Sequence, residues 1–122
     1  MLTFSSCQSY QKFQQSLKQM HTTITAKDLE LAILQDNFQE VQQLFRSQII
    51  TLRTDDINQV CISRWQSLQT EIYKQMRLLE TDLMLLQAAR SSATLLSRQK
   101  GVQNRLHTLI QYCQELLQSS CP

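Results

Sequence analysis

The sequence predicts an all-α protein, an antiparallel bundle of about four helices, three of them long. The 122 residues include one glycine, Gly101, and one proline, Pro122, so the tight turns of a β-rich fold are missing. Apolar residues recur every three or four positions, as on one face of a helix. Glutamine, a good helix former, outnumbers the acidic residues and fills the positions between. The length is that of one domain, and we assign residues 1–122 to a single bundle.

The first helix is expected from about Ser6 to Thr23. A serine at position 5 or 6 can cap its start. The β-branched run Thr22–Thr25 weakens a helix and predicts the first break. Its apolar stripe consists of Tyr10, Phe13, Leu17, Met20 and Ile24.

The second helix is expected to run to about Arg53. The run Thr25–Asp28 has the form of a capping box and predicts its start. An apolar stripe follows from Leu31 to Leu52. The run Thr54–Asp56 then predicts a short turn whose aspartates cap the next helix.

The third helix is expected to be the longest, from about Ile57 to Arg90. Its apolar positions have a mean step of about 3.6 residues, which indicates a straight helix. We expect Ile72, Leu79 and Leu83 on this stripe to be buried.

The fourth helix is expected from about Leu95 to Gln118, after a break and a cap in Ser91–Thr94. Gly101 inside it marks a kink, a fray point or a close helix contact. The short connections favour antiparallel neighbours.

The charge is unevenly distributed, because nine of the ten acidic residues lie between positions 28 and 82. Basic outer helices against an acidic central hairpin would favour correct packing. The net charge of +2 offers few phosphate contacts, so we expect no nucleic-acid binding.

The sequence contains no nucleophile, phosphate-loop or dinucleotide motif. The four cysteines form no CxxC pair, and neither histidine has a ligand spacing to them, so no metal site is expected. We expect a non-enzyme without catalytic residues, cofactor or small-molecule substrate. Cys61 and Cys113 are expected to be buried apolar residues and Cys7 and Cys121 exposed thiols, with a disulfide left open.

The N-terminus does not resemble a secretory signal, and no apolar run is long enough to span a bilayer. We therefore expect a soluble, intracellular protein without membrane insertion.

The end of the third helix is apolar nearly all round, because Leu78, Met84 and Leu85 lie off the buried stripe. Either the N-terminal helix of the same chain covers this end, or a second molecule does. These three residues are therefore candidates for a homodimer interface.

The segment ISRWQSLQTEIYKQMRLLETDLMLLQAAR, from Ile62 to Arg90, resembles the cyanobacterial PatD family, the heterocyst frequency control proteins. The segment RLHTLIQYC, from Arg105 to Cys113, also resembles it. The resemblance implies a cytoplasmic protein, acting at the division site, that binds the tubulin-like protein FtsZ and promotes its assembly. It further implies an influence on how many cells of a filament become heterocysts.

The residues that would contact FtsZ are our own inference from the matching segment. Arginine is favoured at interfaces and makes bidentate contacts with carboxylates, so we select Arg64, Arg77 and Arg90. Glu71 and Asp82 are the nearby acidic candidates. The alternative function is a generic helical homodimeric adaptor or chaperone for another protein.

Overall fold

The computed structural model describes residues 4–53, 57 and 62–118. These residues form four α-helices and no β-strand, which confirms the predicted all-α class. The α-helices are α1 (Phe4–Thr25), α2 (Leu31–Leu44), α3 (Ile62–Gln87) and α4 (Ser92–Gln118). A short π-helical segment, η1 (Phe45–Ile49), continues α2.

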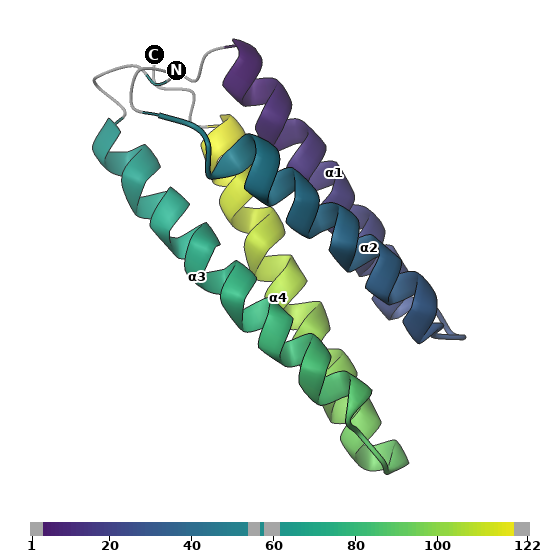
Figure 1. The fold of residues 1–122 in the computed structure, drawn as a ribbon. Coiled ribbons are helices and arrows are strands. Elements are labelled where there is room, and N and C mark those ends of the chain that lie inside the picture. Colours follow the sequence, from purple (N-terminus) through teal and green to yellow (C-terminus); the bar gives the residue numbers. More distant parts are fainter. Residues whose placement is uncertain (1–3, 54–56, 58–61, 119–122) are drawn as a thin grey trace.

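The helices alternate in direction along the chain, as an antiparallel bundle requires (Figure 1). Their backbones approach most closely between α1 and α4, between α3 and α4, and between α1 and α2. The backbones of α2 and α3 make far fewer close approaches. The bundle therefore has four sides, of which the side between α2 and α3 is the widest.

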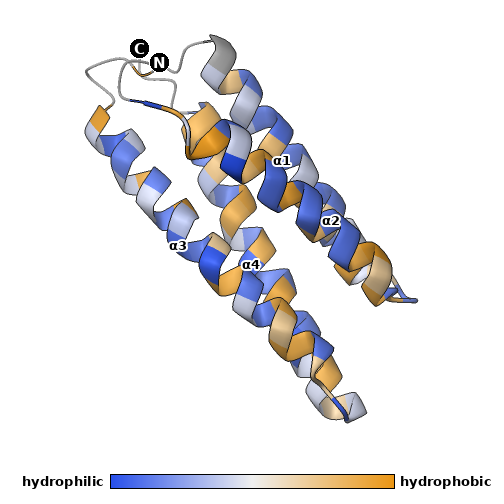
Figure 2. Ribbon diagram, in the orientation of Figure 1, coloured by the Kyte–Doolittle hydropathy of each residue, from blue (hydrophilic) through white to orange (hydrophobic). Residues whose placement is uncertain are grey.

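The core is built from one apolar stripe on each helix, with polar residues between the apolar ones (Figure 2). Ile72, Leu79 and Leu83 are buried, as predicted. The stripes of α1 and α4 are also buried, because each of these helices has two close neighbours. The most deeply buried side chains include Tyr10, Phe13, Leu17, Met20, Leu34, Ile49, Leu86, Leu106 and Leu109.

The predicted capping box at Thr25–Asp28 is wrong as the start of the second helix. The Thr25 hydroxyl instead donates backward to the carbonyls of His21 (2.9 Å) and Thr22 (3.2 Å). This bonding extends α1 to Thr25, and residues 26–28 form a bend. The N-cap of α2 is Glu30, which makes no side-chain capping bond.

The predicted start of the third helix is also wrong, because α3 begins at Ile62 and ends at Gln87. Ile57 lies before α3 and is nevertheless buried, so its side chain contributes to the core from outside the helix. The helical stretch after α2 ends at Ile49, earlier than the predicted Arg53. The predicted turn at residues 54–56 lies outside the described residues.

The predicted cap of the fourth helix is confirmed, because the Thr94 N–H donates to Ser91 Oγ at 3.1 Å. The helix itself begins at Ser92, slightly before the expected Leu95. Gly101 lies inside α4, and a Cβ atom there would meet no atom within 4 Å. A close helix contact at this glycine is therefore excluded.

The cysteines fit the predictions in part. Cys113 is buried, as expected, and burial raises the pKa of its thiol to about 12. Cys7 is half-buried and packs against the core, so the prediction of an exposed thiol is wrong. Cys61 and Cys121 lie outside the described residues.

Replacing Leu79 by alanine tests the core of α3. We expect Leu79→Ala to lower the free energy of unfolding by about 2–5 kcal/mol, because the fully buried side chain leaves a cavity. Leu96→Ala is the control, since that leucine is 65% exposed and its loss should cost under about 0.5 kcal/mol. Equal thermal melts for the two variants would contradict the assigned core.

Candidate protein-interaction surface

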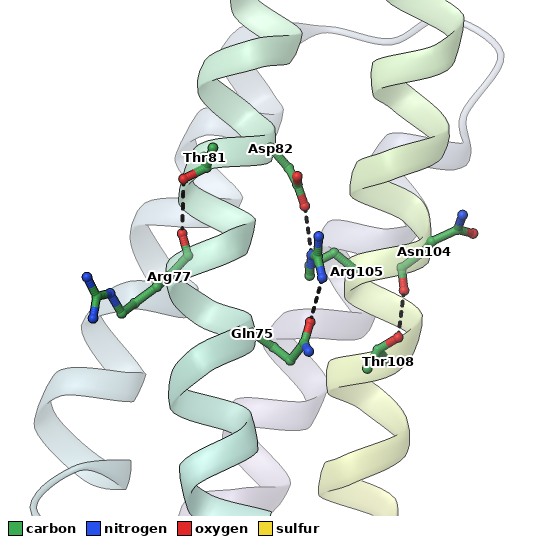
Figure 3. Close-up of polar contacts among 7 residues, drawn as sticks. All are labelled: Gln75, Arg77, Thr81, Asp82, Asn104, Arg105 and Thr108. Atoms are coloured by element: carbon green, nitrogen blue, oxygen red, sulfur yellow. Dashed lines mark hydrogen bonds and ion pairs between the residues drawn. The ribbon is translucent and has the colours of Figure 1, made fainter.

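The three predicted arginines are all exposed. Arg64 and Arg77 lie on α3, and Arg90 follows its end. None of the three makes an ion pair within the described part of the chain. Arg77 reaches away from α4 (Figure 3). Their guanidinium groups are therefore available to another molecule.

The two predicted acidic residues are half-buried, and Asp82 already has a partner. Arg105 on α4 donates from Nε to Asp82 Oδ2 at 2.8 Å and from Nη1 to Gln75 Oε1 at 2.8 Å (Figure 3). This pair joins α3 to α4, and the bound guanidinium satisfies the nearly buried Gln75 amide oxygen. The contribution of Asp82 and Glu71 to partner binding stays a prediction.

The outward residues of α3 form two lines. Residues seven apart lie close to one line along a helix, and Arg64, Glu71, Leu78 and Leu85 have this spacing. The second line has steps of four, three and four residues. It consists of Tyr73, Arg77, Glu80 and Met84.

The second line borders a groove on the wide side of the bundle, which we call the α2–α3 groove. Its volume is about 210 Å³. Phe45 and Met76 are almost completely buried, and the rings of Phe45 and Tyr73 lie 5.8 Å apart between centroids. The groove is lined by Gln42, Phe45, Arg46, Ile50, Tyr73, Met76, Arg77 and Glu80.

A hydrogen-bond network holds η1 beside α3. Trp65 Nε1 donates to the Tyr10 hydroxyl at 2.8 Å, and this hydroxyl donates to Gln69 Oε1. Gln69 Nε2 in turn donates to the Ile49 carbonyl at 2.8 Å. Burial raises the pKa of Tyr10 above its usual value, which keeps its hydroxyl a donor.

The periodicity alone assigned Tyr10 and Trp65 to the apolar core and did not reveal the network. The signal was present in the residue types, because a buried tyrosine or tryptophan needs a partner for its polar atom. The position of Gln69 beside Ile49 depends on tertiary packing and could not be read from spacing.

The tip of the α3–α4 hairpin exposes apolar side chains. Met84 is 64% exposed and Leu85 39% exposed, whereas Leu78 is half-buried. Of the two alternatives for this end, cover by the N-terminal helix is therefore excluded for Met84 and Leu85. The cause is the bundle geometry, in which α3 packs mainly on α4.

The described residues contain no group of histidine, cysteine, aspartate or glutamate side chains that could hold a metal ion. Among the same residues, every helix is too short or too polar to cross a membrane. Comparisons with protein family models, curated proteins and solved structures found no match. The described residues instead present a surface on α3 where exposed charged residues such as Arg77 lie beside exposed apolar residues such as Tyr73 and Met84.

Replacing Tyr10 by phenylalanine tests the network. Tyr10→Phe removes the acceptor of the Trp65 N–H and the donor to Gln69, so we expect a loss of about 1–3 kcal/mol of stability. Tyr112→Phe on α4 removes the hydroxyl of a half-buried tyrosine outside this network and should cost at most about 0.5 kcal/mol. Urea unfolding measures both, and equal midpoints would show that the network contributes nothing.

Proposed function

We propose that this protein is a non-enzymatic regulator that binds FtsZ, promotes its assembly and thereby influences heterocyst frequency. The partner is taken from the resemblance of residues 62–90 to the PatD family. The observation that supports it is the exposure of unpaired arginines beside apolar side chains on that same segment, which forms α3. The corresponding place of action is the cytoplasm, at the division site.

The placement of α3 suits this function. One side of the helix packs on α4, and two lines of residues remain outside that contact. Arg64 and Arg77 can form bidentate hydrogen bonds with carboxylates of a partner. Neighbouring exposed apolar residues, such as Tyr73, supply area that a partner would bury.

One way to promote assembly is for a single particle to contact more than one FtsZ subunit. A homodimer would present two copies of the α3 surface and so join two subunits through effective concentration. We propose that the homodimer forms through Leu78, Met84 and Leu85, because Met84 and Leu85 are exposed within the described chain.

Charge reversal on α3 tests FtsZ binding. We expect Arg77→Glu to weaken co-sedimentation with FtsZ filaments, and to do so more strongly at low salt. Folding should change by no more than about 0.5 kcal/mol, because Arg77 is exposed and makes no ion pair among the described residues. Arg64→Glu and Arg90→Glu test the other two arginines.

Arg98→Glu on α4 is the matched control, since that arginine is also exposed. Unchanged co-sedimentation for Arg64, Arg77 and Arg90 variants would exclude this surface and direct attention to α1. If the parent chain does not sediment with FtsZ at all, the FtsZ function is wrong. The alternative, a homodimeric adaptor or chaperone for another protein, then becomes the better proposal.

A charge at Leu85 tests the homodimer. Leu85→Glu should give a folded monomer, because an unpaired charge is costly only where the interface would bury it. Ile33→Glu on α2 is the control, since Ile33 is 46% exposed on a different helix. Light scattering reports the mass, and a parent chain that is monomeric at micromolar concentration would contradict the dimer.

A further inference from the structure

The α2–α3 groove has an apolar floor between charged rims. Phe45 and Met76 form the floor, and the half-exposed Ile50 and Tyr73 flank it. Binding sites for drug-sized molecules measure about 300–1,000 Å³. At about 210 Å³ the groove is smaller, and it is open to solvent. This size suits a single large apolar side chain that projects from a longer partner segment.

The rims carry the charge that selects this partner. Arg46 on η1 and Arg77 on α3 stand on opposite sides of the groove. Both are exposed, and neither makes an ion pair within the described residues. A carboxylate between them would form charge-assisted hydrogen bonds with one or both guanidinium groups. A basic segment would add a third positive charge and be repelled.

The π-helical segment belongs to the same site. The Ile50 N–H donates to the Phe45 carbonyl at 2.9 Å, one residue farther along than in an α-helix. Ile49 at the end of this segment is buried, whereas the next residue, Ile50, is exposed and lines the groove. Single π turns occur frequently at functional sites. Gln69 fixes the end of the segment through the Ile49 carbonyl, so the rim is positioned before any partner arrives.

We infer that the α2–α3 groove binds an acidic segment of a partner protein, which inserts one large apolar side chain between Arg46 and Arg77. This goes beyond the proposed function, because it assigns a docking site and a partner chemistry that do not require the partner to be FtsZ. Glu80 is the one acidic residue lining the groove, and it lies one turn after Arg77. It repels carboxylates at that end and so sets the direction of the bound segment.

Fluorescence anisotropy with labelled synthetic peptides tests this inference. The probe has glutamates on both sides of a central leucine, and two matched peptides carry lysine for each glutamate or alanine for the leucine. We expect the probe to bind the parent chain at least about tenfold more tightly than either matched peptide, a difference of about 1.4 kcal/mol. Higher salt should weaken the probe's binding.

Variants of the protein locate the binding. The double variant Arg46→Glu with Arg77→Glu should lose about tenfold or more in affinity, and Glu80→Gln should gain. The double variant Arg98→Glu with Lys100→Glu on α4 makes the same change of net charge outside the groove and should bind the probe as the parent does. NMR shifts of the parent on titration should concentrate at Phe45, Ile50 and Tyr73, which is independent of any variant's folding.

Four results would overturn the inference. They are absence of probe binding, equal binding of the acidic and basic peptides, equal loss in the two double variants, and NMR shifts centred on another surface. The FtsZ test is separate, because it uses filaments and not these peptides.

Discussion

The register of α1 against α4 is set by a nearly buried glutamine. Gln14 on α1 donates from Nε2 to Gln114 Oε1 at 2.9 Å and to the Ile110 carbonyl at 3.3 Å, and only 7% of the residue is exposed. A buried amide without partners costs more than the hydrogen bonds gain, so a displaced register is penalised. Because α2 packs on α1 and α3 packs on α4, this interface joins the two helical hairpins of the bundle.

The wide side between α2 and α3 follows from that arrangement. Side chains connect this side of the bundle: Gln87 on α3 donates to Gln35 on α2 at 2.6 Å, and the ring of Phe45 on η1 packs against the ring of Tyr73 on α3. The backbones approach closely at the other three interfaces, so the exposed residues at the rim of the groove are less constrained by folding than its buried floor. Exposed groups such as Arg46 and Arg77 can therefore serve recognition at little cost to the fold.

The periodicity of the sequence predicts the fold class and the buried face of each helix, including Leu79. It does not predict the boundaries that depend on competing local bonds. The Thr25 hydroxyl can cap the next helix or bond backward to His21, and only the structure distinguishes them. Ile57 continues the helical period although it precedes α3. Arg77 is selected because it is an arginine on the segment that resembles the PatD family, whereas its place beside the same groove as Arg46 depends on tertiary packing.

The two lines on α3 allow one helix to serve two contacts. Successive residues of an α-helix are rotated by about 100° around its axis. Met84, on the line that borders the groove, and Leu85, on the other line, therefore face different directions. A dimer centred between them would extend over Arg77, which lies on the same line as Met84, and would crowd the groove. A dimer centred on Leu78 and Leu85, with Met84 at its edge, would have its centre away from the line of residues that borders the groove. The proposed homodimer and the proposed peptide site in the groove are compatible with each other in this second arrangement.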